Sequence, residues 1–510
     1  MMANEDIYGP CILAPVVQTE YGKVQGRWQN ATSAAYLGIP FAAPPIGALR
    51  FAAPAPPDPW DGIRLATDYG PTAQLQGFGG AESVPEPSIP GDATLNVNVF
   101  TPAPRDRRAK LPVLVWIHGG GFYAGSPASP WYNGSSFNRD GIVTVTISYR
   151  LGFDGFGWIE DAPANRGILD QIAALEWVQR NIAEFGGDPD KVTIAGQSAG
   201  GESVQTLMVC PKAKGLFRAA ISESGCYGQT SRDDAERVGK KMAEECHIEP
   251  TVAGWKTLSP EDVLAAQKPH EHEIEPSLVF TVDQVFDALG KGFFGEGGLT
   301  FGPMADGEII PDRIEHLTAK GAGSDIPLLA GSARDEFYFP IPAPPLEAYM
   351  QSLRDRGISE DSVQRFAADV HRIGDDHACG TMMTLWTYHI GLVRLAMNRR
   401  SHGAGARTWL YDFAQYHAYF NGSTHCSDIP YFFDLLHAPN AQRVLGAGAS
   451  QRLADAMHGM WVDFIADGKI DAPSVEDHPF GATRFQNGAS FSADAYTLEG
   501  EILRAAGFSL

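Results

Sequence analysis

The sequence predicts an α/β fold with a large, mostly parallel sheet, because short buried strands alternate with helical segments along the chain. Six segments are continuous apolar runs, the pattern of parallel strands that helices cover on both faces. They are Val113–Ile117, Ile142–Ser148, Val192–Ala195, Ala219–Ser222, Ile326–Ala330 and Thr408–Phe413. No composition break or internal repeat divides the chain, so we expect one domain over residues 15–510 after a tail of residues 1–14.

The clearest helix is predicted from Gly167 to Phe185, directly before the third of these strands. Its apolar residues recur at three- and four-residue spacing, which gives the helix one face that packs on the sheet. Gly186 and Gly187 follow it, and glycine is the common residue just beyond a helix C-terminus.

Composition excludes several classes of protein. The chain has 510 residues, 44% of them hydrophobic, and is therefore too apolar for a disordered protein. Its net charge of −22 argues against a nucleic-acid binder, because a phosphate backbone requires a basic face. The start of the chain lacks the basic end and apolar core of a signal peptide, and no apolar run approaches a membrane span. We therefore predict a cytoplasmic protein without membrane insertion, either a monomer or a homodimer.

Neither the cysteines nor the histidines predict a metal site. The six cysteines form no CxxC pair, so a zinc ribbon is not expected. His270 and His272 alternate with glutamates, a spacing that does not place both rings on one helical face. We interpret this stretch as an exposed polar segment and expect neither a metal nor an organic cofactor.

A predicted strand, a tight turn and a helix meet at Gly196-Gln197-Ser198-Ala199-Gly200. This is the G-x-S-x-G pattern of a nucleophile elbow, in which the serine occupies a strained turn. Glycine is needed at both ends because larger side chains would collide there. The turn would present the Ser198 hydroxyl and the Ala199 N–H at a helix N-terminus, where negative charge is stabilised. Chance alone gives about 0.3 such patterns in this chain, so the context must decide.

A second glycine-rich turn follows the strand Val113–Ile117 and consists of His118-Gly119-Gly120-Gly121-Phe122. It is an HGGG-type loop, which supplies backbone N–H donors to an oxyanion hole. Consecutive glycines let the backbone approach a substrate carbonyl oxygen without an intervening Cβ. His118 is a candidate general base by residue type, but it belongs to the loop that shapes the hole.

Together these motifs resemble the type-B carboxylesterases, the family of cholinesterases, liver-type carboxylesterases and related microbial esterases and lipases. The resemblance runs from about Val16 to about Gly468 and points to a microbial carboxylesterase. Similar blocks lie at Tyr36–Phe51 (YLGIPFAAPPIGALRF), Leu95–Pro102 (LNVNVFTP), Val145–Phe156, Asn165–Pro189, Ser222–Gly225 and Pro303–Pro311. The family implies an α/β-hydrolase fold with helical segments inserted over the active site.

The resemblance also implies the remaining catalytic residues. The family's acid, usually glutamate, falls on Glu336, whereas the adjacent Asp335 matches a non-catalytic position. The segment STHCSDIPYFF, which starts at Ser423, is similar to the family's histidine block and selects His425. Ser198, Glu336 and His425 then follow the α/β-hydrolase order of nucleophile, acid and base.

The surroundings of this triad depart from the family in several places. Gln197 replaces the glutamate that commonly precedes the nucleophile, and no tryptophan lies in the loop before Leu95 to hold a quaternary ammonium group. Choline esters are therefore not expected. Gly297, Gly298 and Leu299 stand where cholinesterases narrow the acyl pocket with aromatic rings, so a roomier acyl site is predicted. The residues assigned to the pocket or to hydrogen bonds behind the triad are Gln197, Ser224 (near the acid), Phe122, Leu299 and Phe339.

Two family disulfides are missing from the sequence. Thr94 and Ala73 stand where secreted members pair two cysteines. Cys246 lacks a partner because Gly254 occupies the matching position. These absences favour a reducing compartment.

The sequence therefore predicts a serine hydrolase of small to medium aryl or alkyl carboxylic esters. His425 would accept the Ser198 proton while Glu336 orients the imidazole. The oxyanion donors are expected to be the N–H groups of Gly120, Gly121 and Ala199. Cleavage of carbamates or activated amides and an interfacial lipase activity remain alternatives. A non-catalytic adhesion role is disfavoured, because all three triad residues are present.

Overall fold

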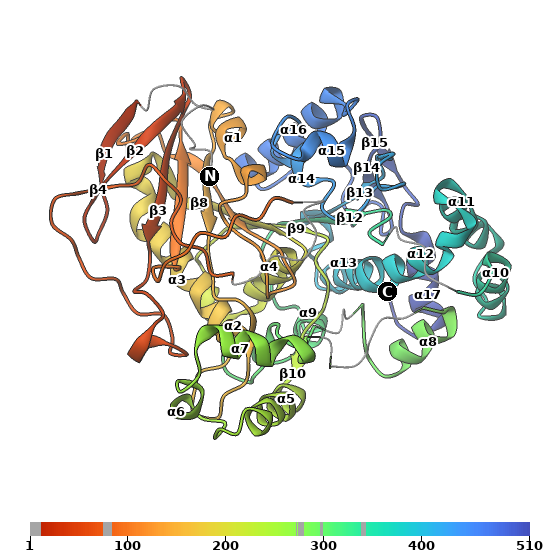
Figure 1. The fold of residues 1–510 in the computed structure, drawn as a ribbon. Helices are drawn as coiled ribbons and strands as arrows, with labels where there is room; N and C mark the ends of the chain where they lie inside the picture. Colours follow the sequence, from red (N-terminus) through yellow and green to blue (C-terminus); the bar gives the residue numbers. More distant parts are fainter. Residues whose placement is uncertain (1–11, 75–83, 272, 274–279, 296–298, 338–342) are drawn as a thin grey trace.

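The computed structural model describes residues 12–74, 84–271, 273, 280–295, 299–337 and 343–510. One large sheet runs through it in the order β1-β2-β3-β5-β7-β6-β8-β9-β12-β13-β14-β15, with β4 paired to β2 (Figure 1). The strands are β1 (Leu13–Gln18), β2 (Lys23–Asn30), β3 (Ser33–Pro40), β4 (Ile63–Leu65), β5 (Asn96–Thr101), β6 (Leu111–Ile117), β7 (Val143–Ile147), β8 (Gly187–Gln197), β9 (Ala219–Glu223), β12 (Leu328–Ala333), β13 (Thr408–Phe413), β14 (Ala482–Phe485) and β15 (Ala489–Ser492). A separate pair joins β10 (Thr230–Ser231) to β11 (Met304–Ala305).

The centre of the sheet is parallel, which confirms the predicted fold class. Strands β7, β6, β8, β9, β12, β13 and β14 pair in parallel, while β1, β2, β3 and β5 form an antiparallel edge. All six predicted strands are present. The one predicted to start at Ile326 starts at Leu328 instead, because Pro327 has no N–H to donate to a ladder.

The helices occupy both faces of the sheet and two insertions. They are α1 (Ser135–Arg139), α2 (Gly152–Phe156), α3 (Arg166–Asn181), α4 (Ala199–Val209), α5 (Arg232–Glu245), α6 (Val252–Trp255), α7 (Pro260–Gln267), α8 (Val282–Gly290), α9 (Ile314–Ala319), α10 (Leu346–Asp355), α11 (Glu360–Ile373), α12 (Ala378–Thr384), α13 (Gly391–Ser401), α14 (Ile429–Phe432), α15 (Ala441–Leu445), α16 (Gln451–Asp467) and α17 (Thr497–Ala505). Helices α5 to α9 lie between β9 and β12 in the chain, and α10 to α13 lie between β12 and β13. Figure 1 shows α5, α6 and α7 of the first insertion at the bottom, whereas α8 lies at the right with α10 and α11 of the second insertion, outside the sheet layers.

Strand β6 shows how the sheet divides the core. Val113, Val115 and Ile117 point into one buried cluster, which α3 and α4 complete. Leu114 and Trp116 point into the other, which α16 completes. Because successive side chains of a strand face opposite sides, a continuous apolar run is the pattern that both layers require.

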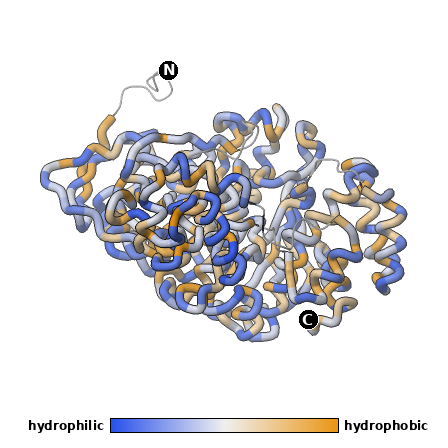
Figure 2. Tube along the Cα trace, turned by 60° about the horizontal axis from the view of Figure 1, so that its bottom comes forward, coloured by the Kyte–Doolittle hydropathy of each residue, from blue (hydrophilic) through white to orange (hydrophobic). Residues whose placement is uncertain are grey.

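Helix α3 ends as the sequence predicts. It spans Arg166–Asn181 and continues as a 3-10 turn to Phe185. Gly186 then adopts φ 85°, the left-handed conformation that stops a helix. Among the described residues, no helix combines the length and the apolar character that a membrane crossing requires. Figure 2 shows hydrophilic and hydrophobic residues mixed along the outer helices.

Candidate active site

Ser198 lies in the turn between β8 and α4, with φ 59° and ψ −125°. A positive φ is strained for a residue with a Cβ, as predicted for a nucleophile elbow. A Cβ on Gly196 would lie 2.5 Å from the Gly200 carbonyl oxygen. A Cβ on Gly200 would overlap the Ile117 carbonyl oxygen. Both glycines are therefore required sterically.

The HGGG loop packs directly against this elbow. A Cβ on Gly119 would lie 2.6 Å from the Gln197 carbonyl oxygen and 3.1 Å from the Ser198 Cβ. Gly120 and Gly121 have φ values of 112° and 59°, which suit only glycine well. Within the described part of the chain, their N–H groups donate to no protein acceptor. The loop thus packs against the serine turn through Gly119 and carries two N–H groups that have no acceptor among the described residues.

Glu336 and His425 meet at the carboxyl end of β12. The Glu336 Oε2 lies 2.5 Å from the His425 Nδ1, and its carboxylate is buried. The other carboxylate oxygen accepts hydrogen bonds from the Ser224 hydroxyl at 2.5 Å and from the Ala333 N–H at 2.9 Å. The contact expected of Ser224 is therefore present, and both oxygens of the buried carboxylate are satisfied.

The neighbours of the His425 imidazole raise its pKa. Burial by itself would lower the pKa of His425, but the acidic groups of Cys426 and Glu336 hold this pKa well above its ordinary 6.5. Burial in turn raises the pKa of the Cys426 thiol, so this thiol is uncharged at neutral pH.

Gln197 lies between His425 and Cys426. Its Nε2 is 3.5 Å from the His425 Nδ1 and 3.4 Å from the His425 Nε2, and its Oε1 accepts from the Cys426 thiol at 3.2 Å. Among the described residues the Ser198 hydroxyl has no hydrogen-bond partner, so the expected bond to His425 is not formed here. Such bonds are often long in unliganded enzymes and tighten when substrate binds.

The alternative base and the alternative acid both lie elsewhere. His118 is buried, its Nδ1 is 2.8 Å from the Gly119 carbonyl oxygen, and its ring stacks on Tyr149 at 4.6 Å. Burial lowers the pKa of His118 to about 4. Asp335 pairs with Arg372 and makes no contact with His425. Neither residue contacts the elbow serine within the described chain.

The expected pocket residues are only partly described. Phe122 is fully buried with φ 64°, and its ring packs edge-on against Phe156 at 4.9 Å. Leu299 is partly buried, and its carbonyl accepts from the Thr230 hydroxyl at 3.1 Å. Phe339 lies outside the described residues, as do Gly297 and Gly298.

The segment at His270 is not exposed as expected, because the His270 side chain is buried and makes ion pairs within the chain. His270 contacts Glu273 through Nδ1 and Glu245 through Nε2, the latter at 2.8 Å, while His272 lies outside the described residues. No group of three or more His, Cys, Asp or Glu side chains suited to a metal ion occurs in the described ranges. Cys210, Cys226, Cys246, Cys379 and Cys426 are unpaired.

Three buried carboxyl groups near the site were missed from the sequence. Glu202 lies one turn beyond Ser198, accepts from the Cys226 thiol at 3.4 Å, and has a pKa that burial raises to about 8. Asp428 accepts from Tyr411 at 3.2 Å, and burial together with the Glu336 charge raises the pKa of Asp428 to about 7. Glu223 accepts from Trp461 at 2.9 Å. Their signal in the sequence was an acidic residue inside each apolar motif block.

The strained serine, the free N–H donors and the His425–Glu336 pair lie at one edge of a parallel sheet, an arrangement that defines a serine hydrolase of the α/β-hydrolase fold. The chain belongs to the carboxylesterase family, whose model matches residues 13–489. It is therefore an esterase that hydrolyses carboxylic esters through a serine, as predicted.

Individual relatives match over nearly the whole chain. The para-nitrobenzyl esterase of Bacillus subtilis is 33% identical over 478 residues, which cover 90% of this chain and 91% of that protein. A thermophilic PNB esterase structure superposes with a TM-score of 0.78. The carboxylesterase structure from Geobacillus stearothermophilus superposes with a TM-score of 0.76. Each structure is 30% identical and covers 96% of this chain and 99% of its own.

Proposed function

We propose that Ser198 is the nucleophile, His425 the general base and Glu336 the acid that orients His425. The observation that carries the assignment is the 2.5 Å contact between His425 Nδ1 and the buried Glu336 carboxylate, beside the strained Ser198 turn. Nδ1 faces the carboxylate, so Nε2 remains to accept a proton. His118, the other histidine considered as a base, makes its hydrogen bond to Gly119 and not to Glu336 in the described chain.

The reaction follows from these positions. Nε2 of His425 accepts the Ser198 proton as Oγ attacks the ester carbonyl carbon, and the N–H donors stabilise the oxyanion. Those donors are Gly120, Gly121 and Ala199, the last at the first position of α4, where helix N–H groups lack internal partners. The tetrahedral intermediate collapses, His425 protonates the departing alcohol, and water activated by His425 cleaves the acyl-enzyme.

We propose small to medium aryl or alkyl esters as substrates. A relative named para-nitrobenzyl esterase supports an aromatic alcohol group. Gln197 adds a neutral amide rather than a carboxylate beside His425, which supports uncharged alcohol groups over choline. Leu299 in place of an aromatic ring supports a roomier acyl side.

We further propose one catalytic domain over residues 15–510, acting in the cytoplasm as a monomer or homodimer. The sheet is continuous from β1 to β15, which supports a single domain. The five described cysteines are unpaired, which supports a reducing compartment.

A fluorophosphonate probe tests the nucleophile, because it reacts covalently with activated serines. We expect wild type to be labelled stoichiometrically and Ser198→Ala not at all. Ser203→Ala, one turn further along the same helix, is the matched control and should still be labelled. Labelling that persists in Ser198→Ala would overturn the assignment.

A substrate panel tests the specificity. p-Nitrophenyl esters from acetyl to hexanoyl should be cleaved at comparable rates, whereas a sharp acetyl preference contradicts the roomy pocket. Matched carbamates and anilides should react more slowly than the esters. A rate that jumps above the critical micelle concentration would instead identify a lipase.

A further inference from the structure

The two loops that carry Glu336 and His425 come from different strands. Glu336 is the third residue after β12, and His425 follows β13 by more than ten residues of irregular chain. Their alignment therefore depends on contacts between the loops. Apart from the His425–Glu336 pair, one backbone bond joins these residues directly, from the His425 N–H to the Glu336 carbonyl oxygen at 3.4 Å.

Asp335 joins the two loops much more closely. Its Oδ2 accepts from the Ser423 N–H at 2.8 Å and from the Ser423 hydroxyl at 2.9 Å. In return, the Asp335 N–H donates to the Ser423 carbonyl oxygen at 3.0 Å. Gly422 permits this approach, since a Cβ there would lie only 3.0 Å from the Asp335 Cβ. Three hydrogen bonds thus fix the chain two residues before His425 to the residue before Glu336.

The last turn of α11 holds Asp335 from the other side. Arg372 donates to both Asp335 oxygens, at 2.6 and 2.9 Å, in a bidentate pair with the buried carboxylate. The final carbonyl of the helix, on Ile373, accepts from the Asn421 side chain at 2.5 Å. One helix end therefore contacts both the acid loop and the histidine loop.

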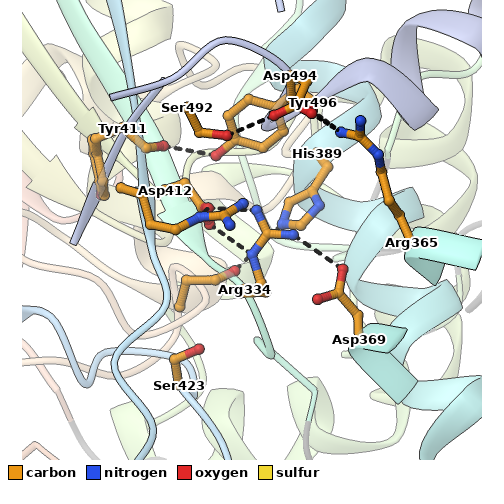
Figure 3. A network of polar contacts seen from close by, with 12 residues as sticks. Arg334, Arg365, Asp369, His389, Tyr411, Asp412, Ser423, Ser492, Asp494 and Tyr496 are labelled. Carbon is orange, nitrogen blue, oxygen red and sulfur yellow. Dashed lines mark hydrogen bonds and ion pairs between the residues drawn. The ribbon is translucent and has the colours of Figure 1, made fainter. Parts of the chain in front are cut away.

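The preceding turn of α11 contacts Arg334, the residue before Asp335, through the carboxylate of Asp369. Arg334 donates to Asp369 at 3.1 Å and to Asp412 of β13 at 3.0 Å. Figure 3 shows the Arg334 guanidinium between these two carboxylates. On α11, Asp369 thus faces the opposite charge of Arg334, and Arg372 faces the opposite charge of Asp335. A shift of the acid loop by one residue would bring like charges together.

We propose that Asp335 is a positioning residue for hydrolysis: held by Arg372, it sets the separation of Glu336 and His425 through Ser423. The inference rests on the proposed triad. Asp335 contacts neither the imidazole nor Ser198, so it acts only through the loops. A small displacement of His425 weakens proton transfer, and misplacements of 1 Å cost about a hundredfold in rate.

The first test is Asp335→Asn, which keeps the shape and removes the charge that Arg372 requires. We expect kcat per titrated active site to fall about 10- to 100-fold while KM stays within about twofold. We also expect the acid limb of the pH–rate profile to move to lower pH, because Glu336 then stabilises the His425 imidazolium less well. A purely structural role predicts a lower Tm but unchanged kcat per active site and an unchanged acid limb, and this result would overturn the proposal.

A second set of variants keeps the test decisive if Asp335→Asn does not fold. Ser423→Ala removes only the hydroxyl donor and should lower kcat about 3- to 10-fold with KM unchanged. Arg372→Lys keeps the positive charge but loses the bidentate geometry. Its kcat should lie between those of wild type and Asp335→Asn. Arg354→Gln on α10, whose ion pairs lie on the surface, is the matched control and should retain full kcat.

Active-site titration with the fluorophosphonate distinguishes a failure of the triad assignment from a failure of the positioning role. If wild type does not titrate, the triad assignment fails. If wild type titrates while Ser423→Ala and Arg372→Lys keep its kcat and pH profile, only the positioning role is refuted.

Discussion

Glu336 faces the His425 ring from a buried position, so its charge should govern the pH dependence of hydrolysis. Activity should fall as the pH drops through the raised pKa of His425, because the protonated form of this proposed general base cannot accept the Ser198 proton. Burial lowers the pKa of His425, and Glu336→Gln removes a negative charge that raises it. We expect its acid limb to lie at lower pH than that of wild type, and its kcat to fall by about 10²- to 10⁴-fold.

Measurement of kcat/KM from pH 5 to pH 9 checks this expectation. Glu347→Gln, an exposed residue of α10, serves as the control and should reproduce the wild-type profile. An acid limb that stays in place in Glu336→Gln would mean that another group stabilises the imidazolium.

The buried carboxyl group of Glu202 should affect the stability of the protein rather than its catalysis. Burial raises its pKa from 4.5 to about 8, so the folded protein keeps the proton that the unfolded chain releases. The free energy of unfolding should therefore decrease as the pH rises from about 4.5 to 8, by at most roughly 5 kcal/mol for this group. Glu202→Gln lacks this titration, and its carbonyl can still accept from the Cys226 thiol.

Thermal unfolding at pH 5 and at pH 8 provides the check. The Tm difference between Glu202→Gln and wild type should be more positive at pH 8 than at pH 5. Exposed Glu176→Gln should show no such dependence. An equal difference at both pH values contradicts a neutral buried Glu202.

The strand–turn–helix unit around Ser198 depends on glycine at two points. Gly200→Ala would push its Cβ into the Ile117 carbonyl oxygen of β6, so the elbow would have to shift. We expect a loss of stability of about 1 to 3 kcal/mol and a larger loss of activity, since Ser198 and the proposed oxyanion donors would move together.

Gly459→Ala in α16 is the matched substitution, because nothing lies within 4 Å of its added Cβ. Alanine in a helix interior should raise stability by about 0.5 to 1 kcal/mol with activity unchanged. Urea unfolding and kcat/KM for both variants test the pair. Full activity in Gly200→Ala would show that the elbow tolerates a side chain.

Secondary structure near the site was predictable because its signals are local. The apolar runs of β6 and β9 and the periodicity of α3 follow from which faces are buried. The start of β12 was predicted two residues too early, because the apolar run begins at Ile326 but Pro327 cannot donate a ladder hydrogen bond.

The proposed triad draws on three strands of one continuous sheet, so catalysis and global folding should be lost together. Ser198 follows β8, Glu336 follows β12, and His425 follows β13. In urea we expect tryptophan fluorescence, far-UV circular dichroism and esterase activity to decline with one common midpoint. Midpoints that differ clearly between probes would indicate two separately folding units.

The sequence by itself determined the fold class, the elbow and the glycine loop. These features depend on steric and hydrophobic requirements of neighbouring residues, which a single chain displays directly. The family resemblance added Glu336 and His425, and their contact is present.

Only the tertiary structure decided how these residues are held. Asp335 and Ser423 are 88 positions apart, and Gln197 and His425 are 228 apart, so no local pattern reveals that they touch. The raised pKa of Glu202 likewise depends on burial by segments distant in the sequence. Long-range packing fixes such contacts and electrostatic environments, because they exist only once the sheet and its loops have assembled.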